Sequence, residues 1–255
     1  MSNHTDKLKL GFLILCLAFY LALMFASFTS AADGADVTYI NNSTFTSTPE
    51  SMTNLGGIIT TVTLDVTYQE GAWKAYVGNI TGILVLRDVD GWSIYEWAMN
   101  SSTMSGFIFV SRSGTVDWDD VVCANSSNVA SEQTFFGMSS SDTYSINNTF
   151  NYSTHAAMDM SGPSNIGASS CQCTATWVNG SAQVVDATAD FQELLLYDRT
   201  NLNFVYGTFI SQDSWGFDNN ESVNGTNHTY DFQVIVAEDR GAAAGEAYYF
   251  YADIS

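Results

Sequence analysis

Residues 191–210 read FQELLLYDRTNLNFVYGTFI, and this stretch decides the fold class. Two runs within it, residues 191–197 and 204–210, are rich in the aromatic, branched and aliphatic residues that strands favour. Between them lie residues 198–201, DRTN, whose Asp and Asn are typical of turns. We therefore predict two β-strands that are separated by a turn.

A second stretch, residues 61–68, shows what kind of strand to expect. It reads TVTLDVTY, so that apolar residues alternate with polar ones along its whole length. Successive side chains of a strand point to opposite faces of the sheet, and a period of two therefore indicates one face on the core and one in water.

Comparable runs recur along the chain at a spacing of roughly ten residues, as in β-sandwich proteins. No window after the N-terminal apolar run shows the 3.6-residue period of a helix. We predict an all-β fold, an antiparallel β-sandwich of about eight to eleven strands that is preceded by one apolar N-terminal helix. The further predicted strands are residues 37–40, 75–77, 82–87, 93–97, 107–111, 175–178, 232–237 and 247–254, with weaker signals at 134–136 and 149–152.

The N-terminal region is typical of a membrane-targeting element. Lys7 and Lys9 precede residues 11–28, GFLILCLAFYLALMFASF, which contain no charged side chain. The length of this run suits both a cleaved signal peptide and a membrane anchor, and we assign one of these two roles to residues 1–32. Because the lysines precede the run and Asp33 and Asp36 follow it, the positive-inside rule predicts that the rest of the chain is extracellular.

The remainder of the chain divides by composition. Residues 33–57 are rich in Ser, Thr and Asn, and we expect them to form a linker. Residues 58–255 carry the strand pattern and form the predicted extracellular β-sandwich domain. Within that domain, residues 124–170 are polar and show only weak strand signals, which indicates a polar insertion or a loop-rich edge.

The charge of the chain excludes one class of partner. Seven Lys and Arg residues face 27 Asp and Glu residues, which gives a formal net charge of −20. Nucleic-acid binding depends on clustered basic residues that neutralise phosphates. We therefore expect no nucleic-acid partner, whereas divalent cations and a crowded cell surface suit such a chain.

The strongest short motif is the N-glycosylation acceptor pattern Asn-x-Ser/Thr. By chance, the composition of the exported part would give roughly four such sites. The exported part contains eleven. We predict glycosylation at Asn41, Asn42, Asn79, Asn100, Asn125, Asn147, Asn151, Asn179, Asn220, Asn224 and Asn227.

Cysteines predict one disulfide. Cys16 lies inside the apolar run, and Cys123, Cys171 and Cys173 follow it. In an oxidising exterior we expect Cys123 to pair with either Cys171 or Cys173. The thiol that is left over is a candidate for a bond between two subunits.

Two clusters of carboxylates are candidates for calcium, which takes six to eight oxygen ligands. They are Asp88 and Asp90 in one turn, and Asp117, Asp119 and Asp120 in another. Neither completes a twelve-residue calcium loop, and each also suits an ordinary turn. We expect no other cofactor.

The aromatic stretch that contains Trp92 and Trp97 has two interpretations. Its rings suit a platform on which sugars stack, with Glu96 as a hydrogen-bond acceptor. The alternation of the same stretch, WSIYEW, also suits a strand whose Trp92 and Ile94 face the core, and we favour that core interpretation.

No catalytic signature is present. The exported part contains only His155 and His228, and it lacks the motifs of zinc proteases, nucleophile elbows and phosphate loops. We expect no enzyme activity. A secreted hydrolase that uses two of the many carboxylates remains a further hypothesis.

The layout of apolar N-terminal segment, Ser/Thr/Asn-rich connector and acidic, sequon-dense β-sandwich resembles archaeal cell-surface glycoproteins, including S-layer and pilus-type subunits. The resemblance implies a structural protein of an envelope layer or an extracellular filament. Its partners would be copies of itself or other envelope proteins, together with the membrane through the N-terminal segment. We expect residues 248–251 to pair with an edge strand of a neighbouring subunit. The alternative function is a glycan-binding or adhesion module.

Overall fold

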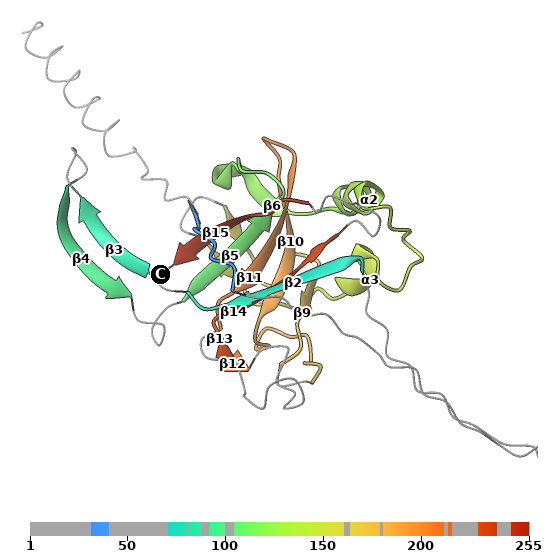
Figure 1. The fold of residues 1–255 in the computed structure, drawn as a ribbon. Coiled ribbons are helices and arrows are strands. Elements are labelled where there is room, and N and C mark those ends of the chain that lie inside the picture. The colour runs from blue at the N-terminus through green and yellow to red at the C-terminus, as the bar shows by residue number, and fades with distance from the viewer. Residues whose placement is uncertain are drawn as a thin grey trace, which may run out of the picture.

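The computed structural model describes residues 32–40, 71–80, 82–87, 92–99, 105–160, 164–178, 181–211, 214–215, 229–238 and 246–254. These residues form mostly β-strands, all paired antiparallel, with few helices (Figure 1). The prediction of an all-β, antiparallel fold is therefore confirmed. The predicted strand at residues 61–68 and most of the N-terminal segment and linker lie outside the described residues.

The largest element is a seven-stranded sheet at the centre of the molecule (Figure 1). Its strand order is β1-β15-β5-β11-β10-β6, and β9 also pairs with β10. The bounds are β1 Asp33–Gly34, β5 Gly106–Ser111, β6 Val121–Cys123, β9 Cys173–Ala175, β10 Gln192–Asp198, β11 Asn203–Phe209 and β15 Tyr249–Ile254.

The predicted pair of strands at residues 191–210 is confirmed as β10 and β11 at the middle of this sheet. The register pairs Leu195 with Tyr206 and Asp198 with Asn203. Leu194 packs on one face of the sheet, against Phe109, while Leu195 packs on the other. Both faces are thus buried, which explains why these strands read as almost continuous apolar runs.

Smaller elements cover one of the two faces. The strands β2 (Trp73–Gly78) and β14 (Phe232–Ala237) pair with each other, and the buried Val234 and Val236 of β14 belong to the same core cluster as Leu195. Helices α2 (Ser126–Phe135) and α3 (Ile146–Thr149) add Val129 and Ile146 to that cluster.

The opposite face is covered by the 3₁₀ helix η2 (Trp118–Asp120) and by the paired strands β7 (Met158–Asp159) and β8 (Asn165–Ile166). Trp118, Met158 and Ile166 are buried against it. Two further pairs complete the described strands: β3 (Gly82–Arg87) with β4 (Ser93–Met99), and β12 (Ser214–Trp215) with β13 (Thr229–Tyr230).

Both weaker strand predictions were wrong, because residues 134 and 135 belong to helix α2 and Thr149 belongs to helix α3, with only an isolated bridge at Tyr152. Residues 37–40 form no strand, and the predicted strand at 175–178 shares only Ala175 with β9. The segment expected to be a polar insertion also contributes buried apolar side chains, among them Phe136, Ile146 and Phe150. Helix α2 begins with a capping box, in which Asn125 accepts the backbone N–H of Asn128 and the Asn128 side chain accepts that of Asn125.

Residues 248–251 were expected to pair with a neighbouring subunit. Strand β15 lies between β5 and β1, and Tyr251 is opposite both Phe109 and Gly34 in the register. Part of its backbone therefore pairs within the chain, and the pairing between subunits stays a prediction.

Across the described ranges, no helix has both the length and the apolar character needed to cross a membrane. The apolar run at residues 11–28 is outside those ranges.

Candidate functional site

A hollow of about 330 Å³ lies where three distant segments meet beside helix α2. The end of β5 contributes Ser111 and Arg112, and the helix contributes Asn128, Ser131, Glu132 and Phe135. The third wall is the β10–β11 turn, with Tyr197, Leu202 and Asn203. We call this hollow the α2 pocket. Its volume is at the small end of the range of ligand sites.

An ion pair belongs to the lining of the α2 pocket. The Arg112 Nη2 donates to Glu132 Oε2 at 2.7 Å, and the Arg112 Nε donates to Oε1 at 3.3 Å. The Glu132 side chain is only 5% exposed, and the Arg112 guanidinium lies 3.7 Å from the ring centre of Phe135. This bidentate geometry fixes the guanidinium plane.

Burial and charge act against each other in this pair. Burial raises the pKa of Glu132, and the hydrogen bond and charge of Arg112 only partly oppose that rise. Burial acts to lower the pKa of Arg112, but the hydrogen bond from Arg112 to Glu132 and the Glu132 charge outweigh it and leave that pKa raised. When both groups are ionised, their opposite charges cancel within the pair.

Helix α2 presents its pocket residues from one side. Asn128, Glu132 and Phe135 are spaced by four and three residues, which places them above one another on a helix. The capping box at Asn125 fixes where the helix begins and therefore which side faces the pocket.

The β10–β11 turn is held by one buried carboxylate. Asp198 accepts the backbone N–H groups of Thr200 and Asn201 at 3.0 Å and that of Asp117 at 2.9 Å. The turn places Leu202 at the pocket rim with φ of +58° and a side chain that is 69% exposed. This left-handed conformation is costly for a leucine, and such strain is concentrated at functional sites.

The polar groups of the pocket offer both donors and acceptors. Within the described part of the chain, the Arg112 Nη1 and the hydroxyls of Ser131 and Tyr197 have no protein partner. Asn203 donates its amide to Thr115 O at 2.7 Å, which leaves its Oδ1 available as an acceptor.

The predicted calcium ligands Asp117, Asp119 and Asp120 do not converge. Asp117 caps η2 by accepting the Asp119 backbone N–H at 3.2 Å, and Asp120 is paired with Arg199. Where the structure describes the chain, no three acidic, histidine or cysteine side chains are grouped to hold a metal ion. Asp88 and Asp90 lie outside the described residues.

The predicted sugar platform lies on the β3–β4 pair. Trp92 is 74% exposed, Ile94 is 63% exposed and Tyr95 is 55% exposed. The core interpretation of Trp92 and Ile94 was therefore wrong, since neither is buried. Trp97 belongs to β4, but its side chain lies outside the described residues.

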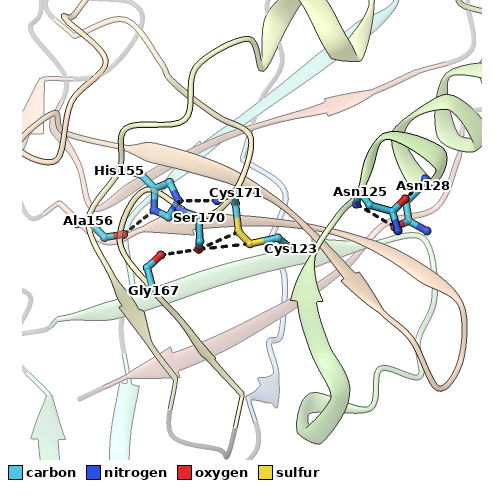
Figure 2. The surroundings of a disulfide bond; sticks show 8 residues. All are labelled: Cys123, Asn125, Asn128, His155, Ala156, Gly167, Ser170 and Cys171. Carbon is cyan, nitrogen blue, oxygen red and sulfur yellow. Dashed lines mark hydrogen bonds between the residues drawn. A yellow bond between two sulfur atoms is a disulfide. The ribbon is translucent and has the colours of Figure 1, made fainter.

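The cysteine pairing is Cys123 with Cys171, with Cα atoms 5.1 Å apart (Figure 2). Cys173 is a free thiol, fully buried in β9. A bond from Cys173 to another subunit was therefore a wrong expectation. Burial also raises the pKa of Cys173 to about 11, which keeps it protonated.

His155 uses both ring nitrogens to hold the local backbone. It is fully buried, its Nδ1 contacts Ala156 O at 2.6 Å, and its Nε2 contacts the backbone N–H groups of Ser170 and Cys171 (Figure 2). This pattern assigns the acceptor role to Nε2 and the donor role to Nδ1.

Four of the predicted glycosylation sites fall on described residues, and all four asparagines are exposed: Asn79, Asn125, Asn147 and Asn151. The side chains of the other seven lie outside the described residues. Glycosylation itself stays a prediction.

Comparison of the chain with protein-family models, with curated proteins and with solved structures found no match. The α2 pocket was missed from the sequence, because no local motif marks the meeting of three segments that lie far apart in the chain.

Proposed function

We propose that the chain is an exported, N-glycosylated structural protein of the cell surface, a subunit of an envelope layer or an extracellular filament. In this proposal the apolar N-terminal segment forms a helix that serves as signal peptide or anchor, and the strands form a β-sandwich domain. A disulfide fits an oxidising, extracellular environment. The exposure of Asn79, Asn125, Asn147 and Asn151 supports glycan attachment.

The observation that carries the structural role is the β3–β4 pair. It lies apart from the central sheet (Figure 1), and among the described strands β3 and β4 pair only with each other. An isolated two-stranded sheet is marginally stable in water. A further strand can add to the edge of a sheet of this kind.

The sequence of the pair suits a buried position. Strand β3 reads GILVLR, with four successive apolar residues, which is typical of a strand covered on both faces. On β4, the exposed Ile94 and Tyr95 present apolar surface to water. We infer that another protein covers this surface in the assembled state.

The charges favour a second copy of the same chain as the protein that covers the β3–β4 pair. Two molecules with a net charge of −20 repel each other over most of their surface. The β3 and β4 strands contain one cation, Arg87, and one anion, Glu96, and so are neutral together, whereas the segment between them adds Asp88 and Asp90. Two copies approach with least repulsion along the apolar strands, away from that segment.

The test compares wild-type protein with the variants Ile94→Asp and Val184→Asp. Val184 is 79% exposed, so its variant adds the same charge to an exposed apolar position outside the pair. Light scattering and electron microscopy of the purified full chain should show assemblies for wild type and Val184→Asp, and monomers for Ile94→Asp. Monomeric wild-type protein at every concentration, or undiminished assembly of Ile94→Asp, would reject the proposal.

A glycan-binding or adhesion module is the second candidate function. The α2 pocket favours it, because the pocket joins exposed apolar side chains to unpaired donors and acceptors.

A further inference from the structure

We propose that the α2 pocket binds a neutral saccharide. The proposal rests on the second candidate function and assigns it a site and a ligand class. It is independent of assembly through the β3–β4 pair, since neither β3 nor β4 contributes a residue to the pocket.

The charge balance of the pocket selects an uncharged ligand. Arg112 is the one cation in the lining, and two of its nitrogens are engaged by Glu132. An anion would have to compete with that buried carboxylate, and a cation would meet a carboxylate whose two oxygens already accept hydrogen bonds. Because a buried ion pair is costly to break, a ligand that leaves it intact is favoured.

The hydrogen-bonding groups suit hydroxyls. A sugar hydroxyl donates one hydrogen bond and accepts others, as a serine hydroxyl does. The residues that line the pocket include a donor at Arg112 Nη1, an acceptor at Asn203 Oδ1 and hydroxyls of both kinds at Ser131 and Tyr197. A purely apolar ligand would leave these groups without partners at a cost in affinity.

The apolar part of the lining suits the C–H surface of a sugar ring. Phe135 is 51% exposed, and Leu202, which also lines the pocket, is exposed as well. The negative face of an aromatic ring attracts polarised C–H groups. Arg112 stacks on Phe135 at 3.7 Å and holds the ring in place.

One saccharide source lies next to the pocket in the same chain. Asn125 is exposed, is the N-cap of α2 and is three residues from the pocket residue Asn128 (Figure 2). The cap uses Asn125 Oδ1, which accepts from Ser127 and Asn128. A glycan attaches through Nδ2, so glycosylation leaves the cap intact and starts a sugar chain beside the pocket.

The experiment separates this source from glycans of other molecules. Ser127→Ala removes the acceptor pattern but keeps Asn125 and its cap, because the cap uses the backbone of residue 127. Ser126→Ala is the matched control that keeps the pattern. Binding is measured by saturation-transfer NMR with glucose, galactose, mannose, N-acetylglucosamine and glycans released from the protein itself.

We expect the Ser127→Ala protein to bind at least one of these probes. Adding Ser131→Trp, which fills the pocket, should weaken that binding at least tenfold. Adding Thr134→Trp places the same bulk on an exposed helix position outside the pocket and should leave that binding unchanged. Binding that is stronger in Ser127→Ala than in Ser126→Ala assigns the pocket to the Asn125 glycan. Equal binding assigns it to glycans of other molecules.

Absence of binding by the Ser127→Ala protein to every probe would overturn the proposal. Equal effects of Ser131→Trp and Thr134→Trp would also overturn it. Binding that persists at full strength after Ser131→Trp would reject the pocket and leave glycan binding elsewhere on the chain intact.

Discussion

The Nε2 atom of His155 accepts the backbone N–H of Cys171 at 2.9 Å, and it also accepts that of Ser170 at 3.0 Å. One buried imidazole thereby orients the segment that carries half of the disulfide (Figure 2). The rest of the hydrogen-bonding capacity of the ring is used by Ala156 O. No capacity is left for a substrate.

We predict that His155→Ala destabilises the fold by about 3 kcal/mol, because it leaves two buried donors unpaired and opens a cavity. Urea unfolding at constant pH measures this change. Tyr152→Ala is a control at a nearby, half-exposed aromatic residue and should cost less. A loss below about 1 kcal/mol for His155→Ala would contradict the anchoring role.

The disulfide should stabilise the fold about as much as a large buried side chain does. Cys123 and Cys171 are 48 residues apart in sequence, and closing a loop of that length is worth about 4 kcal/mol in the chain-entropy model. The double variant Cys123→Ser with Cys171→Ser should therefore lose about that much unfolding free energy. Equal stability of the variant and the oxidised wild type would refute this estimate.

Cys173 should be chemically inert in the folded protein. Its side chain is fully buried, and burial raises its pKa to about 11. Because the thiolate is the reactive form, maleimide should not label Cys173 under native conditions and should label it after unfolding in urea. Peptide mass mapping distinguishes Cys173 from Cys16. Rapid labelling of Cys173 in the native protein would show that its thiol is exposed to solvent and would contradict the prediction.

Glu193 should make stability depend on pH. It is fully buried on β10, where Oε2 accepts the Ile235 N–H at 2.9 Å and Oε1 has no partner. Burial raises the pKa of Glu193 well above its ordinary value. The folded state therefore binds this proton at pH values where the unfolded chain has released it, and stability falls as pH rises above about 4.3.

The expected slope is up to about 1.4 kcal/mol per pH unit until the folded-state pKa is reached. Glu193→Gln keeps an acceptor for Ile235 but cannot ionise, so that its unfolding free energy should lose this part of the pH dependence. Denaturation of both proteins between pH 5 and pH 8 isolates the contribution of Glu193 by difference. Parallel pH profiles would contradict the prediction.

Local pattern was sufficient to predict most strands. The predicted strands at residues 82–87 and 232–237 coincide with β3 and β14, and those in residues 191–210 differ from β10 and β11 by one residue at each end. In each of these strands, runs of aliphatic and aromatic residues are bounded by turn residues. Strand propensity and tertiary burial therefore agree.

The sequence of helix α2 lacks a helical period of apolar residues for a physical reason. Its buried side includes Glu132 and Gln133 beside Val129, and the Glu132 charge is compensated by Arg112 from β5. An apolar period is absent from the sequence because an ion pair with a distant segment replaces part of the hydrophobic face. The α2 pocket depends on that same long-range contact, which pattern analysis of single segments does not detect.

Peptide mass mapping of the protein isolated from its native source tests export and glycosylation most directly. The account predicts glycan mass on the exposed asparagines Asn79, Asn125, Asn147 and Asn151, and a cross-linked peptide that joins Cys123 to Cys171. Unmodified asparagines together with reduced cysteines at positions 123 and 171 would contradict it.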